Sequence, residues 1–153
     1  LVGGMEALLS GTTTLVDHHA SPNAIDGSLD IVEEALRSVG VRSVLCYETS
    51  DRDGPERALA GVVENRRFLD RVRRERLPLA RGMVGAHASF TLSDETLAAC
   101  CEAAGVHGVG LHIHAAEDGA DERDAVARCG AVRYVTRKLV SEVLAPEPLR
   151  LRS

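Results

Sequence analysis

The chain has 153 residues, of which 44% are hydrophobic and 27% charged, a composition typical of a globular domain that can bury a core. Its aromatic content is 3% and its net charge is −5, values that argue against modules that stack nucleic-acid bases on aromatic side chains. No apolar run approaches the ~20 residues of a membrane span, and no signal peptide is evident. We therefore expect a cytoplasmic protein that has neither nucleic acid nor a membrane as a partner.

Four short apolar segments alternate with amphipathic ones along the chain. The apolar segments predict strands over residues 12–17, 42–48, 82–87 and 109–115. Apolar stripes at helical spacing predict helices within residues 29–39, 55–72, 93–104 and 123–144. Gly130 interrupts the last of these helices. The strand starts recur at intervals close to the ~30 residues of one strand–helix unit, which indicates a parallel sheet covered by helices.

Several residues predict where the helices begin and end. Asp26 or Ser28 is a candidate cap for the first predicted helix, Pro55 suits a first turn, and Ser93 suits the cap of the third. The second predicted helix is followed by a cluster of arginines, namely Arg71, Arg73, Arg74 and Arg76. Basic residues are favourable at the end of a helix, so we expect a solvated helix end rather than a phosphate-binding patch.

Two architectures fit this alternation, a doubly wound open sheet and a (β/α)8 barrel. An open sheet gathers ligands mainly at one switch point and often on a glycine-rich turn, which the sequence lacks. A barrel gathers chemistry at the carboxyl ends of several strands. Polar residues at such ends are His18 or His19, Glu48, His87, His114 and Glu117. They favour the barrel, although a complete barrel takes ~250 residues and four strands are half of one.

The fourth predicted strand carries His112 and His114, and Glu117 follows three residues later. Two side chains that are two positions apart on a strand point to the same side of the sheet. Imidazole is the commonest metal ligand, and a carboxylate just past the strand can reach a water on the metal without being a ligand itself. Taken alone, the two-histidine pattern is equally compatible with a structural role. We expect His112, which lies deeper, to pack or to support the site.

Three segments, in order along the chain, resemble the deaminase and chlorohydrolase branch of the amidohydrolase superfamily. They are GTTTLVDHH (11–19), GAHASFTLSDETL (85–97) and GLHIHAAEDGAD (110–121). Within this branch, the last segment together with VDHHASPNAIDGSLD (16–30) is most similar to the SsnA-type aminohydrolases. The resemblance implies an α/β fold that is a partial metal-dependent-hydrolase (β/α)8 (TIM) barrel, roughly strands 2 to 5 with their helices. We assign residues 1–144 to this partial barrel domain and residues 145–153 to a disordered tail.

The resemblance also implies roles for individual residues. His114 is the expected metal ligand on the fifth barrel strand, and Glu117 is the expected general acid and base. His87 on the fourth strand is expected to contact the substrate or to stabilise a developing oxyanion. His18 and His19 match the second-strand pattern and are candidates for substrate contact. By alternation only one of the two can face inward, and a structural role at the loop end is equally compatible.

The expected function is that of a metal-dependent hydrolase acting on C–N bonds other than peptide bonds, by deamination of a cyclic amidine or nucleobase-like small molecule. The expected cofactor is a divalent ion, Zn²⁺ or Fe²⁺, which lowers the pKa of bound water to about 7. Family members take further ligands from the first, sixth and eighth barrel strands, for which this sequence offers no counterparts. Because catalytic zinc typically has three protein ligands, we expect that the chain does not hold the ion by itself.

Two other interpretations remain open at this point. The first is a truncated or split-gene fragment without activity of its own, whose partner would be a complementary chain fragment or a second copy. The second is an open-sheet binding domain, which a flat five-stranded sheet would establish.

Some polar residues have simpler interpretations. Cys46 is expected to be a buried thiol, and the four cysteines, which lack CxxC spacing, are expected to be reduced. Glu48 is expected to pair with an arginine or to face a pocket mouth, and His107 to lie in a surface turn. Three acids near the last predicted helix are expected to complement its dipole, namely Asp118, Asp121 and Glu122.

Overall fold

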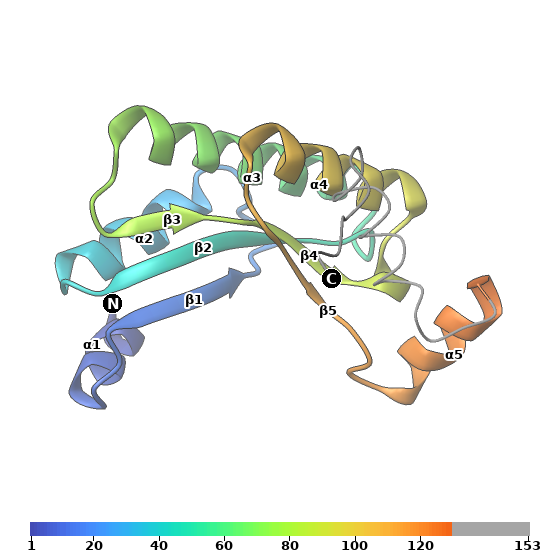
Figure 1. The fold of residues 1–153 in the computed structure, drawn as a ribbon, viewed down its shortest axis with the longest axis horizontal. Coiled ribbons are helices and arrows are strands. Elements are labelled where there is room, and N and C mark those ends of the chain that lie inside the picture. The colour runs from blue at the N-terminus through green and yellow to red at the C-terminus, as the bar shows by residue number, and fades with distance from the viewer. Residues whose placement is uncertain (130–153) are drawn as a thin grey trace, which may run out of the picture.

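The computed structural model describes residues 1–129, in which helices pack on one face of a parallel sheet (Figure 1). The strands are β1 (Thr14–His19), β2 (Arg42–Thr49), β3 (Ala80–Gly82), β4 (Val84–Ala88) and β5 (Leu111–His114). The helices are α1 (Val2–Leu9), α2 (Ser28–Ser38), α3 (Pro55–Glu75), α4 (Asp94–His107) and α5 (Gly119–Cys129), with a short 3-10 helix, η1 (Ser89–Thr91). The predicted alternation of strands and helices is confirmed.

The strands follow one another across the sheet in chain order, β1-β2-β4-β5, and each neighbouring pair is parallel. β3 also pairs with β2. Together β3 and β4 correspond to the single strand predicted over residues 82–87, divided at Met83, whose N–H donates to the carbonyl of Leu45. A doubly wound sheet reverses its strand order at a switch point, whereas a barrel places each strand beside the preceding one. The observed order is that of a barrel segment.

The sheet is strongly curved. Three spacings of ~4.8 Å separate β1 from β5, so side chains on these two strands would lie about 14 Å apart in a flat sheet. Instead Nδ1 of His18 on β1 lies 3.2 Å from Nε2 of His114 on β5. The two edge strands therefore turn toward each other across a concave inner face. This curvature excludes the flat open sheet and confirms the predicted class, a partial (β/α)8 barrel.

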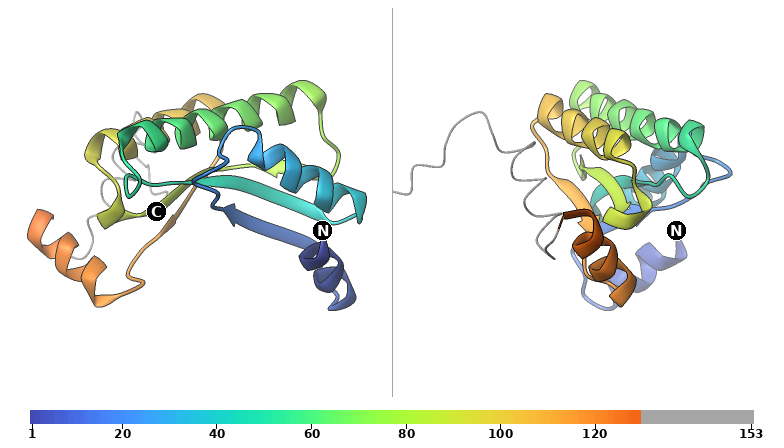
Figure 2. Two further views of the ribbon diagram at one scale, coloured as in Figure 1. Left: turned by 180° about the vertical axis from the view of Figure 1, so that it is seen from behind. Right: turned by 90° about the vertical axis from the view of Figure 1, so that its right-hand side faces the viewer.

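Alternate strand residues point to opposite faces of this sheet. The outer face packs against α2, α3 and α4, which lie on one side of the sheet in both views of Figure 2. It consists of Leu15, Leu45, Tyr47, Val84, Ala86, Leu111 and Ile113. The inner face is the opposite set, namely Val16, His18, Val44, Cys46, Glu48, His87, His112 and His114. The candidate site residues therefore gather on the inner face.

Two of the predicted helix starts are confirmed, because Pro55 is the first residue of α3 and the Ser93 side chain caps α4. The helix predicted over residues 123–144 begins earlier, at Gly119. Its later part, the domain boundary at residue 144 and the tail 145–153 lie outside the described residues. Within the described part of the chain, no helix is both long and apolar enough to cross a membrane.

The start of α2 is capped differently from the prediction. Neither Asp26 nor Ser28 provides a side-chain cap. The carboxylate of Glu64 on α3, which is 1% exposed, accepts the backbone N–H groups of Gly27 and Leu29 at 3.1 Å each. A buried carboxylate that satisfies free N–H groups at a helix start is favoured by the helix dipole. The cap thus also joins α2 to α3.

The arginines near the end of α3 divide into two kinds. Arg71 contacts α2, where its guanidinium lies 2.9 Å from a carboxylate oxygen of Asp30, and Arg67 makes a second bond of 2.9 Å to the same carboxylate. Arg73 and Arg74 are exposed, as the prediction of a solvated helix end required. For Arg71 that prediction is wrong, because its side chain is 20% exposed and pairs with Asp30 of α2.

Asn65 of α3 is fully buried and inserts its amide into the sheet. Its Oδ1 accepts the N–H groups of Tyr47 at 2.9 Å and Gly85 at 3.2 Å, and its Nδ2 donates to the Tyr47 carbonyl at 2.9 Å. A Cβ added at Gly85 would collide with the Tyr47 carbonyl. Asn65 and Gly85 therefore set the close approach of β2 and β4 just before the strand ends that carry the site.

Candidate metal and catalytic site

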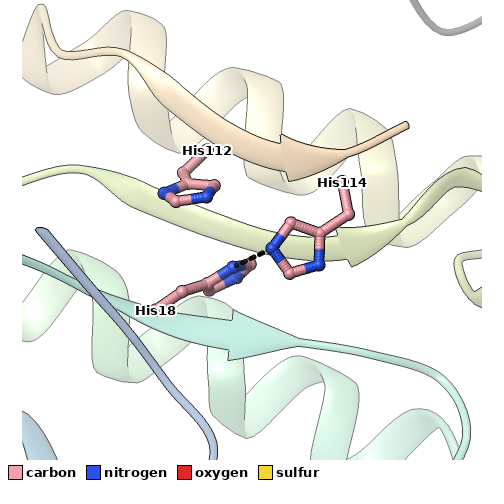
Figure 3. A group of neighbouring side chains, drawn as sticks. All are labelled: His18, His112 and His114. Atoms are coloured by element: carbon pink, nitrogen blue, oxygen red, sulfur yellow. Dashed lines mark hydrogen bonds between the residues drawn. The ribbon is translucent and has the colours of Figure 1, made fainter. Parts of the chain in front are cut away.

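Four of the described histidines lie on the inner face near the carboxyl ends of β1, β4 and β5. Figure 3 shows three of them, His18, His112 and His114, with their rings directed toward one another. The ring centroid of His18 lies 4.4 Å from that of His112 and 4.8 Å from that of His114. His87 borders the group, with its ring centroid 5.9 Å from that of His114. Three separate strands thus contribute to one group of imidazoles.

The structure decides which histidine of β1 faces inward. His18 points into the group, whereas Nε2 of His19 lies 3.1 Å from the hydroxyl of Ser21. The ring of His19 also lies 6.3 Å from that of Tyr47, a residue of the outer-face core. Of the two candidates for substrate contact, the fold therefore brings His18 to the other site residues and leaves His19 on the opposite side of the sheet.

The pair His18 and His114 has unmet bonding capacity. The two facing nitrogens, 3.2 Å apart, can share one hydrogen. The other ring nitrogens, His18 Nε2 and His114 Nδ1, are buried without a hydrogen-bond partner among the described residues. Since a neutral imidazole has one N–H and one bare nitrogen, either direction of the hydrogen bond between the two rings leaves one buried N–H and one buried lone pair unsatisfied. Such groups are costly unless a ligand completes them.

Two histidines of the group, His18 and His112, are poor proton acceptors. Burial, and then the neighbouring His112, His114 and His87, lower the pKa of His18 to about 4. Burial and then His114 also lower the pKa of His112 from its ordinary value. Both rings are therefore neutral at pH 7, which is the protonation state in which imidazole binds a metal ion.

His87 on β4 is held in a defined tautomer. Its Nδ1 lies 2.9 Å from the hydroxyl oxygen of Thr91, which itself donates to the Ala88 carbonyl at 2.9 Å. Because the hydroxyl hydrogen is used there, Thr91 accepts and Nδ1 of His87 donates. Nε2 of a neutral His87 is therefore bare. In this tautomer, donation from Nε2 to an oxyanion requires the protonated ring.

Glu117 lies in the loop between β5 and α5. Its Oε2 is 3.9 Å from Nδ1 of His114, and its side chain is 63% exposed. The loop is fixed by Asp121, 2% exposed, which accepts the hydroxyl of Ser89 at 2.6 Å and the N–H of Ala116. Asp121 was expected only to complement a helix dipole. It instead positions the residue before Glu117 against the segment that follows β4, a role that nothing in the local sequence pattern distinguishes.

Two groups of described residues could hold a metal ion, each with potential ligand atoms within 4.8 Å of one another. One is His18, His112 and His114, and the other is His87, His114 and Glu117. Imidazole nitrogens and a carboxylate oxygen suit Zn²⁺ and similar divalent ions. Together with the unpartnered nitrogens of His18 and His114, this donor set fits the expected metal.

The chain matches the amidohydrolase family over residues 1–143. It belongs to this family. The membership predicted from the three sequence segments is therefore confirmed. The amidohydrolase match extends past the described part of the chain and includes every candidate site residue.

Curated relatives of this amidohydrolase include deaminases of nucleosides. A 5-methylthioadenosine/S-adenosylhomocysteine deaminase of Symbiobacterium thermophilum is 31% identical over 136 residues, which cover 88% of this chain and 30% of the relative. A 5'-deoxyadenosine deaminase of Methanosarcina barkeri is 29% identical over 121 residues, or 79% of this chain and 26% of the relative. The chain thus spans less than a third of the length of these relatives.

Solved structures of similar fold include a deaminase and a hydrolase. An adenosine deaminase from Xanthomonas campestris with bound zinc has a TM-score of 0.69 at 20% identity, covering 88% of this chain and 29% of that one. A triazine hydrolase variant has a TM-score of 0.70 at 19% identity, covering 87% and 32%. These likenesses establish the fold, a portion of a larger barrel.

The remaining polar residues show mixed agreement with the predictions. Cys46 is 1% exposed, and burial raises the pKa of its thiol to about 12, so the expected buried thiol is confirmed. Glu48 pairs with Arg52 at 2.6 Å, as one of its two interpretations required. The surface turn expected for His107 is wrong. It is the last residue of α4, and its Nδ1 lies 2.8 Å from the Ala103 carbonyl.

Proposed function

We propose that the chain is part of a metal-dependent amidohydrolase that deaminates an adenine nucleoside or a similar nucleobase-like small molecule. The proposal rests on the convergence of His87, His114 and Glu117 at the carboxyl ends of β4 and β5 in a chain of this family. The relatives named above as nucleoside deaminases support the substrate class. The reaction adds water to the carbon that bears the amino group and releases ammonia, which leaves a carbonyl group in the product.

His114 would hold the divalent ion, zinc or iron, together with ligands from other strands of the barrel. When bound, such an ion lowers the pKa of a water molecule to about 7. Glu117 takes a proton from the attacking water and returns it to the departing ammonia, a transfer that its position just past β5 and its exposed side chain permit. His87, protonated at Nε2, donates a hydrogen bond to the negative charge that develops as water adds.

Ammonia release tests this proposal. The protein encoded by the complete reading frame that contains these residues is assayed with adenosine, 5'-deoxyadenosine and 5'-methylthioadenosine. We expect release from at least one of them, reduced about 10²- to 10⁴-fold in kcat by Glu117→Gln because general acid–base catalysis contributes that much. Glu122→Gln, an exposed acid of the same region, is the matched control and should keep wild-type activity. Absence of release from all three would refute the assignment to adenine nucleosides, and an unchanged kcat in Glu117→Gln would refute the role of Glu117.

A second interpretation is a fragment that has no activity of its own and needs a complementary chain. The observation in its favour is that the chain spans less than a third of the length of its curated relatives. The DNA on both sides of the coding segment distinguishes the two. An interrupted frame whose flanks encode a further histidine pair and histidine-bearing strands indicates a broken or split gene. An uninterrupted frame through the same elements supports the intact enzyme.

A further inference from the structure

His18 and His112 take no part in the proton transfers proposed above, yet both lie against His114. They come from opposite edges of the sheet, because β1 and β5 are its first and last strands. Two imidazoles from different edges meet at this distance only because the sheet curves. The contact is therefore a consequence of the barrel fold and not of local sequence.

The spacing of the nitrogens matches that of a tetrahedral metal site. Two nitrogens that each lie 2.0–2.1 Å from a tetrahedral zinc ion are about 3.3 Å apart. His18 Nδ1 and His114 Nε2 are 3.2 Å apart. His18, His112 and His114 can each offer one ring nitrogen such that all three lie within 4.8 Å of one another. The rings of His112 and His114 lie 5.6 Å apart and are tilted by 73°, so both can direct a nitrogen toward one point.

We infer that His18, His112 and His114 form a three-histidine site for a zinc-type divalent ion within this chain. All three side chains are partly exposed, so solvent can supply a fourth ligand. An ion bound through His18 Nδ1 and His114 Nε2 would replace the hydrogen bond between these two nitrogens. The earlier expectation that the chain cannot hold a metal by itself counted His114 as the single ligand. The fold adds two imidazoles to it.

The other candidate group is His87, His114 and Glu117. Its side chains are less well ordered for binding an ion. The carboxylate of Glu117 is 63% exposed and would have to be ordered on binding, at an entropic cost. His87 could contribute Nε2, since its Nδ1 is engaged by Thr91. The three-histidine site needs no exposed side chain to be ordered, and for this reason it is the stronger of the two groups among the described residues.

Cobalt provides a direct test. The 153-residue chain is freed of metal with a chelator and titrated with Co²⁺, whose visible absorption reports a low coordination number with imidazole ligands. Zn²⁺ is then added in competition. We expect one ion per chain. His18→Ala and His112→Ala should each weaken binding more than about 100-fold, because loss of even an outer partner of a ligand costs 10- to 100-fold. His19→Ala, on the same strand as His18 but on the opposite face, is the matched control and should bind as the wild type does.

Two further variants separate the competing groups. His87→Ala and Glu117→Gln should retain the ion if the three-histidine site holds it. Retention in His18→Ala and His112→Ala with loss in these two variants would overturn the inference in favour of the second group. Absence of stoichiometric binding by the wild type would overturn it as well. Circular dichroism of every variant shows whether the fold is kept.

The wild-type chain alone gives an independent readout. Zinc-edge X-ray absorption counts the coordinated imidazoles, and we expect three at ~2.0–2.1 Å. One imidazole together with oxygen ligands would contradict the site even if a histidine variant failed to fold. The inference does not depend on the proposed deamination, because these measurements use no substrate. Failure of ammonia release leaves it standing, and failure of metal binding by this chain leaves deamination by the complete barrel standing.

Discussion

The two faces of the sheet are built from alternate residues of the same strands, yet they differ in burial and in chemistry. On the outer face Leu45 and Val84 are fully buried beneath helices. On the inner face Val16 is 57% exposed, and the strand ends carry imidazoles. The closed apolar face stabilises the fold, and the open polar face is free to bind a ligand. Substitutions on the two faces should therefore have different consequences, which the following predictions test.

The largest effect should come from apolar residues at matched positions on the two faces. Leu45→Ala removes a fully buried side chain and should lower the free energy of unfolding by about 2–5 kcal/mol. Val16→Ala, on the inner face, should change it by no more than about 0.5 kcal/mol. Urea unfolding of both variants measures the difference. Equal losses would show that the inner face is closed in solution, contrary to the division described above.

Much of this division could be predicted from sequence. The apolar runs located the strands, and the period of two placed His112 and His114 on one face together with residues at other strand ends. Alternation also showed that only one of His18 and His19 can face inward. Which of the two does so depends on how β1 docks against the core around Tyr47, and that is a tertiary property.

Other features had no local signal. The approach of His18 to His112 depends on the curvature of the whole sheet, so His112 was expected only to pack or to support the site. Asp121 resembles an ordinary acid in a first helical turn, and its bond to Ser89 joins residues 32 positions apart. Asn65 lies among charged residues of α3, and its burial follows from the insertion of its amide between β2 and β4.

A smaller effect should appear in the pH dependence of the free energy of unfolding, through His18 on the inner face. In the folded chain the pKa of His18 is about 4, against 6.5 ordinarily. As pH falls from 6.5 toward 4, the unfolded chain gains a proton that the folded chain does not, so the free energy of unfolding should decrease in this window. His18→Gln, measured with EDTA present, should lose less stability between pH 7 and pH 4.5 than the wild type. His19→Gln should behave as the wild type. An identical loss in His18→Gln would exclude His18 as the cause.

The smallest effect concerns the helix layer over the outer face. Burial would raise the pKa of Asp30, but hydrogen bonds and charge from Arg67 and Arg71 outweigh it and hold the pKa below 3.8. This contribution is present above pH 3.8 and is lost as pH falls further, a window distinct from that of His18. Because Asp30 is partly exposed, Asp30→Asn should cost no more than about 1 kcal/mol at pH 7.

Urea unfolding at pH 7 and pH 3 measures this contribution. The cost of Asp30→Asn should be smaller at pH 3, because this pH lies below 3.8, where the contribution of the ion pairs is already being lost. Asp26→Asn is the control, since Asp26 is 97% exposed and lies 4.0 Å from Arg67. A cost for Asp30→Asn that is the same at both pH values would show that the ion pairs to α3 are not its source.

The central claim is that the inner face carries a metal site assembled from both edges of the curved sheet. An anomalous-difference map at the zinc edge, from crystals of the 153-residue chain grown with Zn²⁺, tests it most directly. We expect a peak enclosed by His18, His112 and His114. A peak beside His87 and Glu117 that is out of reach of His18, or no peak on the inner face, would contradict it.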